Sequence, residues 1–288
     1  MKKWNRIIIN RSNKITKINK VKDFKDFCDE DAEKFGNEEG GYKSNRYYQN
    51  KKKFLEFYLK GRNLVLHNYL KNNLDPKVKT LSIGTGRGIN ELSLISNNFD
   101  IVCSDLEVPQ CYESSKKLFG VFDYIKLDIF KSIINDEFQS IFCLSTFYLF
   151  SDQELQKVFT NINKILKKDG ILILEFSGTE DNLISFLFHE IYLVIEVYLA
   201  YYLSKLLNKQ IGFKIDNNFG YRRKNQEIKE FAKKYGFKFI DIHEYDYLEE
   251  LQRSILIEKI IKYFPLSRKL FIALGKKLPY IRMFKFKK

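Results

Sequence analysis

A short glycine-rich segment is the feature of this sequence with the clearest chemical potential. Residues 80–90 read T-L-S-I-G-T-G-R-G-I-N and connect a short apolar run to a segment that we predict to be helical. Glycines adopt backbone torsions that are closed to other residues, so they let the main chain approach a bound molecule closely. The first turn of the following helix also offers backbone N–H groups that have no helical partner. Gly84, Gly86 and Gly88 therefore predict a turn that cradles part of a ligand.

Two carboxylates follow the glycine turn, each at the end of a predicted strand. Asp105 comes 21 residues after Gly84, where a carboxylate can accept two hydrogen bonds from the diol of a ribose. Asp128 lies between Leu127 and Ile129, a setting that suits the amino group of an adenine. Parallel sheets bind ligands at the carboxyl ends of their strands, so the turn and both carboxylates are expected at one edge.

The spacing of the glycines argues against a dinucleotide. The dinucleotide-binding fingerprint reads G-x-G-x-x-G or G-x-G-x-x-A, whereas this chain has Ile89 at the last of those positions. Each feature also has a plainer explanation when it is taken alone. A tight strand-to-helix turn uses glycines for its torsions, and Asp105 and Asp128 can each be solvated loop residues. The three features together favour a nucleoside-binding site.

The elements that position these groups alternate between strands and helices. Strands are expected over residues 78–83, 100–104, 124–127, 141–145, 171–176 and 237–242 and after Pro279, and helices over residues 51–72, 89–97, 112–118, 151–166 and 225–235. Near-continuous apolar strands that alternate with helices are typical of a parallel sheet covered on both faces. The pattern therefore predicts the α/β class with a mostly parallel sheet.

Two long apolar segments interrupt the alternation after the fifth and sixth strands. They span residues 179–223 and 248–277, and both are longer than ordinary α/β connections. We predict that both are helical insertions that form a lid. Residues 1–50 are expected to be a partly ordered arm, followed by a single domain over residues 51–288.

Residues 78–176 resemble the core of class I S-adenosylmethionine-dependent methyltransferases. The segment LSIGTGRG is similar to the first motif of that family, IVCSD to the second, and KLDIF to the adenine-binding turn. Residues 138–176 resemble the fourth strand, the following helix and the fifth strand. The resemblance implies a Rossmann-like, seven-stranded sheet with helices on both faces. It also implies S-adenosyl-L-methionine as the cofactor and methyl transfer as the activity.

The resemblance assigns individual residues to parts of the cofactor. The methionine part is assigned to Gly84, Thr85, Gly86 and Gly88, the ribose to Asp105 with Leu106, the adenine to Asp128 with Ile129, and the reactive sulfonium to Leu144 and Ser145. Ser82 departs from the family pattern, because the family usually has an acidic residue there that helps to position the amino group of the cofactor. A serine can bond that group through water, with a lower affinity or a changed geometry.

Methyl transfer from a sulfonium requires little of the protein beyond alignment of the acceptor and exclusion of water. A general base is needed when the acceptor is a hydroxyl or a protonated amine. His189 and Glu196 are the candidates, because they share one arc of a predicted helix with Ser185 and Tyr192. Two alternatives stay open for this stripe: it faces solvent, or the helix lies on a membrane.

Two signatures of related enzymes are absent from the sequence. The chain lacks the Asp/Asn-Pro-Pro-Tyr signature of many adenine, cytosine and glutamine N-methyltransferases after the fourth strand. It also lacks the acidic metal-binding set of catechol-type enzymes, so no metal site is expected. The predicted acceptor is a small molecule, a glycan or a lipid-linked intermediate. The alternatives are an RNA methyltransferase, a non-catalytic cofactor-binding protein and an aminopropyl transferase.

The charge and the cysteines bear on partners and location. The net charge is +14, but only 10 of the 50 basic residues are arginine, the residue best suited to planar phosphate recognition. The charge therefore favours a solvated basic surface or an anionic membrane over nucleic acid. Cys28, Cys103, Cys111 and Cys143 form no C-x-x-C pair, which indicates reduced thiols. We expect a cytoplasmic protein with peripheral membrane contact as one alternative, and we find no signal peptide.

Overall fold

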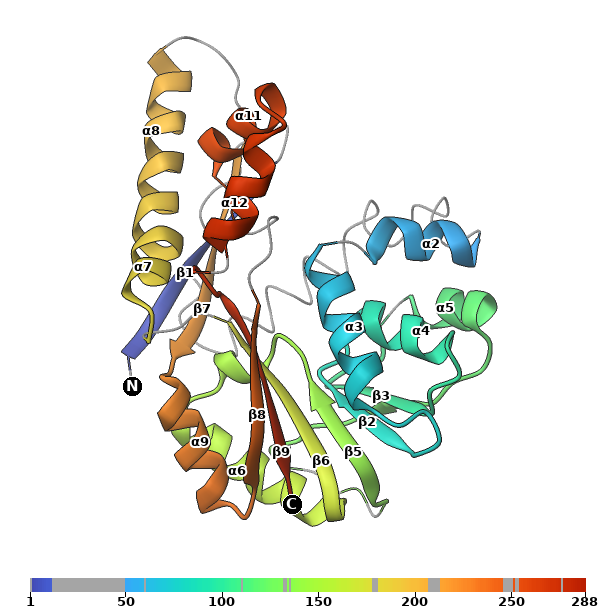
Figure 1. The fold of residues 1–288 in the computed structure, drawn as a ribbon. Helices are drawn as coiled ribbons and strands as arrows, with labels where there is room; N and C mark the ends of the chain where they lie inside the picture. The colour runs from blue at the N-terminus through green and yellow to red at the C-terminus, as the bar shows by residue number, and fades with distance from the viewer. Residues whose placement is uncertain are drawn as a thin grey trace. The chain divides into compact units, whose positions relative to one another are not determined.

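The computed structural model describes two compact parts of the chain (Figure 1). The described residues are 2–11, 50–59, 61–109, 111–131, 134, 136–177, 181–206, 213–245, 251, 254–275 and 277–288. Unit 1 comprises Met1–Glu30, Ser177–Asn225 and Glu244–Arg282, and unit 2 comprises Asp31–Phe176, Gln226–His243 and Met283–Lys288. Both predicted insertions fall in unit 1. The predicted division into an arm and a single domain stays a prediction.

Unit 2 is built around a seven-stranded, mostly parallel sheet. Its strands are β2 (Thr80–Ile83), β3 (Ile101–Asp105), β4 (Tyr124–Lys126), β5 (Phe138–Cys143), β6 (Leu166–Ser177), β8 (Lys238–Tyr245) and β9 (Ile281–Lys287). They follow the order β4-β3-β2-β5-β6-β9-β8, and the pairs from β4 to β6 are parallel. The order reverses at β2, which is where open α/β sheets bind ligands. The predicted α/β, Rossmann-like fold is confirmed.

Two helices of unit 2 precede β2, and the others follow strands in sequence, as expected. They are α2 (Lys51–Tyr58), α3 (Arg62–Asn73), α4 (Ile89–Ile95), α5 (Tyr112–Phe119), the 3-10 turn η1 (Phe147–Leu149), α6 (Asp152–Ile165) and α9 (Asn225–Lys234). Helix α6 begins at a capping box, in which Ser151 and Glu154 bond each other's backbone N–H groups. Its buried side includes Phe159, which packs against Phe231 of α9 with ring centroids 5.6 Å apart. The apolar side of α6, which its periodicity predicts, is therefore the side that packs against α9.

Two local predictions in unit 2 need correction. The helix predicted over residues 51–72 is two helices, because Gly61 has φ 51° and ψ −123°, a conformation that only glycine adopts readily. The strand predicted from Ile171 begins earlier, at Leu166. Its pairing with β5 shifts between Phe138 and Ser140, and Asp169 has φ 62° there. Asp169 and Gly170, which lie between the predicted helix and strand, therefore belong to a bulge inside β6.

Unit 1 combines a long helical segment, a helix pair and a two-stranded sheet. The helical segment is α7 (Leu183–Phe186), the π-helical turn η2 (Leu187–Tyr192) and α8 (Leu193–Leu206), and the pair is α11 (Ile255–Tyr263) and α12 (Ser267–Gly275). Strand β1 (Lys2–Arg11) pairs antiparallel with β7 (Phe213–Arg222). The prediction of helix throughout residues 179–223 is therefore wrong over β7. Strand formation depends on the partner strand, and the partner of β7 is β1, which lies near the N-terminus and far from β7 in sequence.

Candidate functional site

The glycine turn after β2 has the backbone conformation that its composition predicts. Gly84, Gly86 and Gly88 have φ values of +70°, +53° and +68°, in the left-handed region that other residues avoid. A Cβ atom on Gly84 would lie 2.6 Å from Oγ1 of Thr146, so the turn packs closely against the loop after β5. A Cβ on Gly86 would meet nothing within 4 Å, which leaves that part of the backbone open to a ligand.

Hydrogen bonds hold the glycine turn against the end of β3. The N–H of Thr85 donates to the carbonyl of Ser104 at 2.9 Å, and the N–H of Ser104 donates to Oγ1 of Thr85 at 3.0 Å. The hydroxyl of Ser104 donates to the carbonyl of Ser82 at 2.7 Å. Thr85 and Ser104 are both buried. The first two predicted parts of the site are therefore joined by direct contacts.

Asp105 connects the two loops most directly. Its Oδ2 accepts the N–H of Gly86 at 2.7 Å, and its Oδ1 accepts the N–H of Leu106 at 2.7 Å. Burial raises the pKa of Asp105, and these two hydrogen bonds oppose that rise. An ionised carboxylate has about four lone-pair sites, so each oxygen of Asp105 can accept a further hydrogen bond. A pair of hydroxyl donors would therefore stabilise this desolvated carboxylate.

The loop after β4 adjoins the same edge. The N–H of Leu127 donates to the carbonyl of Asp105 at 2.8 Å, which links the ends of β3 and β4. Asp128 accepts the N–H of Phe130 at 3.0 Å and pairs with the ammonium of Lys131, also at 3.0 Å. Ile129 is buried, at 5% exposure. Contacts within the loop therefore hold it in place, and the loop has an acidic side chain, Asp128, next to an apolar one, Ile129.

An acidic residue that the sequence did not suggest lies beside Ser82. The hydroxyl of Ser82 donates to Oε1 of Glu91 at 2.7 Å, and both side chains are buried. Burial raises the pKa of Glu91 to about 7; hydrogen bonds lower it, and the charge of Asp105 raises it. Glu91 thus brings a carboxyl group beside Ser82, the residue at which the family pattern has its acid. Its place in the first turn of α4 concealed it, because acidic residues are common there for electrostatic reasons.

Replacing Glu91 with glutamine is expected to remove a pH dependence of stability. The folded-state pKa of about 7 lies above the ordinary 4.5, so the folded state holds a proton that the unfolded state loses between these values. The free energy of unfolding should therefore fall by about 3 kcal/mol as the pH rises from 4.5 to 7. Urea unfolding at several pH values, followed by circular dichroism, measures this slope.

The matched control for Glu91 is Glu113, an exposed residue of α5 that pairs with Lys116. Glu113→Gln should leave the pH slope of the wild type unchanged. Equal slopes in the wild type and Glu91→Gln would show that Glu91 titrates normally.

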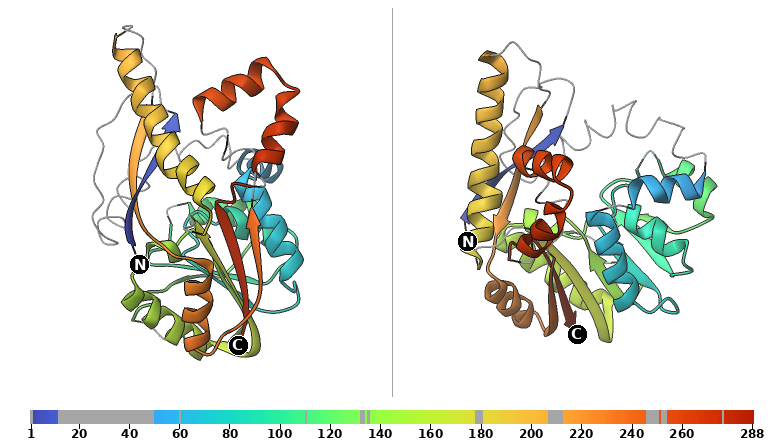
Figure 2. Two further views of the ribbon diagram at one scale, coloured as in Figure 1. Left: turned by 60° about the vertical axis from the view of Figure 1, so that its left-hand side comes forward. Right: turned by 45° about the horizontal axis from the view of Figure 1, so that its top comes forward.

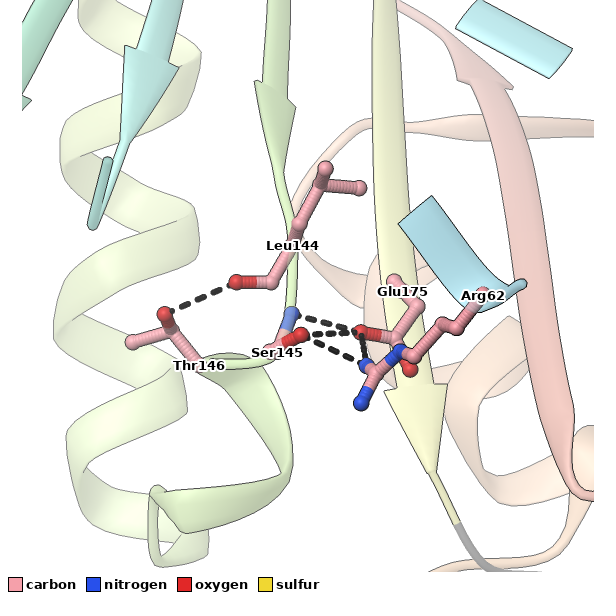
Figure 3. A network of polar contacts seen from close by, with 5 residues as sticks. All are labelled: Arg62, Leu144, Ser145, Thr146 and Glu175. Carbon is pink, nitrogen blue, oxygen red and sulfur yellow. Dashed lines mark hydrogen bonds and ion pairs between the residues drawn. The ribbon is translucent and has the colours of Figure 1, made fainter. Parts of the chain in front are cut away.

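A buried network lies at the ends of β5 and β6 (Figure 3). Glu175 is completely buried, and its Oε2 accepts the N–H of Ser145 at 2.6 Å and the hydroxyl of Ser145 at 3.0 Å. Nη2 of Arg62 donates to the same Oε2 at 2.7 Å and to Oγ of Ser145 at 2.6 Å. Ser145 has φ 58°, so the network holds it in a left-handed conformation. Its hydroxyl is therefore engaged within the protein.

Arg62 and Glu175 were not among the predicted site residues. Glu175 had a signal in the sequence, since it is the one charged residue in the apolar run ILILEF. Arg62 had none, because it lies within a segment where many charged residues are expected to face solvent. Its position follows from Gly61, whose turn starts α3 at Arg62.

The two candidate bases lie in unit 1, on the stripe that we expected along one helix. The hydroxyl of Ser185 donates to the carbonyl of Pro279 at 2.8 Å. Nε2 of His189 lies 3.4 Å from the carbonyl of Leu278, and its ring lies 4.5 Å from that of Tyr280. Ser185 and His189 are 1% and 5% exposed, so the alternative in which the stripe faces solvent is wrong for this first half of it.

The second half of the stripe contacts the start of α11. Oε1 of Glu196 accepts the hydroxyl of Ser254 at 3.0 Å and the N–H of Leu256 at 2.8 Å. The hydroxyl of Tyr192 lies 3.3 Å from Oε1 of Glu196. Glu196 thus binds the N-terminal end of α11, where a negative charge is favourable. Its role as a base stays a prediction.

Three of the four cysteines lie in the part of the chain that the structure describes. Cys103, Cys111 and Cys143 are free and buried, and Cys28 lies outside the described residues. Burial raises the pKa of Cys103 and Cys143, which disfavours the reactive thiolate. We therefore assign these thiols to the core.

Comparison with known proteins agrees with this architecture. Residues 81–174 match the family model described as "Methyltransferase domain". A solved structure of Burkholderia thailandensis 1,6-didemethyltoxoflavin-N1-methyltransferase, bound to 1,6-didemethyltoxoflavin and S-adenosylhomocysteine, is 9% identical with a TM-score of 0.55. That alignment covers 95% of this chain and 93% of that one. The glycopeptide N-methyltransferase MtfA is 7% identical with a TM-score of 0.50, covering 77% and 88%. No curated protein matches significantly.

Proposed function

We propose that this chain, whose residues 81–174 match the family model of a methyltransferase domain, is a class I, S-adenosylmethionine-dependent enzyme that methylates a small-molecule, glycan or lipid-linked acceptor. The enzyme class and the cofactor follow from the family match and the Rossmann-like fold. The observation that carries the proposal is the 2.7 Å hydrogen bond between Gly86 and Asp105, which joins the glycine turn to a desolvated carboxylate. The methyltransferases named above are named for 1,6-didemethyltoxoflavin and for a glycopeptide, and we extend this broad class of acceptor to the present chain.

We assign the cofactor to the carboxyl ends of β2, β3, β4 and β5. The glycine turn, with Thr85, would hold the methionine part, and the Ser82–Glu91 pair would hold its amino group. Asp105 and Leu106 would hold the ribose, Asp128 and Ile129 the adenine, and Ser145 would lie near the sulfonium. The hydrogen bonds between these loops support the assignment, as does the open space at Gly86.

When bound, S-adenosyl-L-methionine supplies the methyl group and the thioether that leaves. The residues of this chain then have three tasks, which are to bind, to orient and to exclude water. Asp105 would fix the ribose with charge-assisted hydrogen bonds, which are stronger than neutral ones. The Arg62–Glu175 pair would keep Ser145 and its loop in one conformation, so that the acceptor approaches along a fixed line.

We retain the insertions of unit 1 as the proposed source of acceptor contacts, with His189 and Glu196 as candidate bases. We also propose a cytoplasmic enzyme that contacts a membrane peripherally. Nucleic acid is not a proposed partner, since the charge is dominated by lysine.

The proposed function is tested by calorimetry and a transfer assay. S-adenosylmethionine and S-adenosylhomocysteine should each bind once per chain, and labelled methyl groups should enter a small-molecule, glycan or lipid acceptor. Binding without transfer across a broad acceptor panel would support a non-catalytic cofactor-binding protein. Transfer to RNA instead would overturn the proposed acceptor class.

His189→Ala and Glu196→Ala are both expected to preserve cofactor affinity. The variant that removes the residue acting as general base should also lower turnover by about a hundredfold or more. Glu196→Ala should also lower the free energy of unfolding by about 1 kcal/mol, because α11 loses a cap-like acceptor. Glu196→Gln keeps an acceptor oxygen and separates the two effects. Unchanged turnover in His189→Ala and Glu196→Gln would remove both residues from the mechanism.

A further inference from the structure

The helical segment over residues 183–206 is oriented in the opposite way to a helix of an ordinary soluble protein. A surface helix normally buries its apolar side and exposes its polar side. Here the polar stripe from Ser185 to Glu196 contacts residues 254–280, and the apolar side is exposed. The exposed apolar residues are Leu183, Ile184, Leu187, Ile191, Ile195, Tyr198, Leu199, Tyr202, Leu203 and Leu206, at 38% to 80% exposure.

This exposed side is long and continuous. Ile184, Leu187, Ile191 and Ile195 recur at intervals of three and four residues, which places them in one row along the helix. Among the described residues, one helix is long and apolar enough to cross a membrane, and it spans Leu183–Ala200. Its mean hydropathy is 1.7, and 19% of it is buried. Contiguous apolar surface of this extent marks an interaction site.

Figure 2 shows the helix pair α11–α12 of unit 1 in orange-red. The side chains of this pair add a second exposed apolar region. Tyr263, Phe264 and Leu266 lie at the link between the helices and are 70%, 68% and 89% exposed. Leu256, Leu270, Ile272 and Leu274 on the helices are also exposed, at 43% to 60%. The link thus presents two aromatic rings and a leucine together. We call residues 263–266 the apolar link.

Basic residues surround the apolar link. Residues 254–278 contain six basic residues and one acidic residue. Lys259 and Lys262 precede the link, Arg268 and Lys269 follow it, and all four are exposed. Aromatic and aliphatic side chains flanked by lysine and arginine are typical of helices that lie in a membrane interface. Each such residue near an anionic membrane strengthens binding by roughly fivefold.

We propose that the apolar side of residues 183–206, together with the apolar link, docks this enzyme onto the surface of an anionic phospholipid membrane. The proposal deepens the peripheral contact proposed above and rests on it. A spanning arrangement fits the contacts less well. The polar stripe is engaged with residues 254–280, so a helix that crossed the bilayer would take this basic segment into hydrocarbon, at a high energetic cost.

Vesicle flotation with the full chain tests the proposal. The protein should float with phosphatidylcholine vesicles that contain phosphatidylglycerol. It should bind at least tenfold less to phosphatidylcholine alone or at high salt, since ionic strength screens exposed charges. The triple variant Tyr263→Ser, Phe264→Ser, Leu266→Ser should bind tenfold or more weakly, because all three apolar groups would leave the interface. The triple variant Lys262→Glu, Arg268→Glu, Lys269→Glu should lose the preference for anionic lipid.

Matched controls separate this result from misfolding and from failure of the proposed function. Val121 of unit 2 is 92% exposed and lies away from these segments in sequence, so Val121→Ser should float like the wild type. Calorimetry with S-adenosylhomocysteine should give the same affinity in all variants, which reports on unit 2 independently of lipid. Failure to float with either vesicle, or equal flotation of the triple serine variant, would overturn the proposal. A stable dimer that this variant dissociates would assign the surface to a second copy and also overturn it.

Discussion

Replacing Asp105 with alanine is expected to weaken binding of S-adenosylmethionine by tenfold or more. Each hydrogen bond to a charged group contributes about 1.5–3 kcal/mol, and alanine removes the acceptor proposed for the ribose diol. The substitution also removes the 2.7 Å bond from the N–H of Gly86, so the glycine turn loses its anchor to β3. Isothermal titration at constant pH measures the dissociation constant of both S-adenosylmethionine and S-adenosylhomocysteine.

Two further variants make the Asp105 experiment specific. Asp105→Asn keeps one acceptor oxygen but loses the charge, so its affinity should lie between those of the wild type and Asp105→Ala. Asp136 is a carboxylate of the same unit that precedes β5 and pairs with Lys79 on the surface. Asp136→Ala should bind the cofactor like the wild type. Equal affinity in Asp105→Ala and the wild type would contradict the assignment of the site.

Replacing Arg62 with methionine is expected to lower the free energy of unfolding by about 3–5 kcal/mol. Removal of one partner from a buried ion pair leaves an uncompensated charge, which costs this much in measured cases. Glu175 has no exposed side-chain surface, whereas Arg62 keeps 26% of its own, so the cost falls mainly on the carboxylate that remains. Urea denaturation followed by circular dichroism measures the loss.

The controls for Arg62 use one surface pair and one compensating change. Lys79 and Asp136 form an exposed pair at the same 2.7 Å distance, and Lys79→Met should cost less than about 1 kcal/mol. Adding Glu175→Leu to Arg62→Met should recover part of the lost stability, because the buried charge is then absent. If Arg62→Met and Lys79→Met lose the same stability, the network of Figure 3 contributes no more than a surface contact.

Ser82 illustrates how a departure from a sequence motif can be compensated in three dimensions. The sequence alone suggested a missing acid and a weaker hold on the cofactor. The fold places Glu91, nine residues later, within hydrogen-bonding distance of the Ser82 hydroxyl. The carboxyl group is therefore present, but it comes from the helix and not from the strand. Its raised pKa also makes it sensitive to pH near neutrality, which a solvated acid would not be.

The sequence by itself determined the order of strands and helices from β2 to α6, and later α9, β8 and β9. These elements depend on local information, which consists of apolar runs, helical periodicity, caps and glycines. The glycine turn, Asp105 and Asp128 were located for the same reason, since each directly follows a strand. The junction at Gly61 was missed, because an isolated glycine in a helical pattern does not by itself indicate a break.

Only the tertiary structure could show the features that depend on contacts between residues distant in the chain. Arg62 and Glu175 are 113 positions apart, and β7 forms a strand against β1 at the other end of the sequence. The polar stripe of residues 183–206 was read correctly as a stripe, but its partner, residues 254–280, decided that it faces inward. Pairing energies of this kind arise only when the chain brings both partners together, so a local pattern such as the lone charge of Glu175 or the polar stripe does not identify the partner.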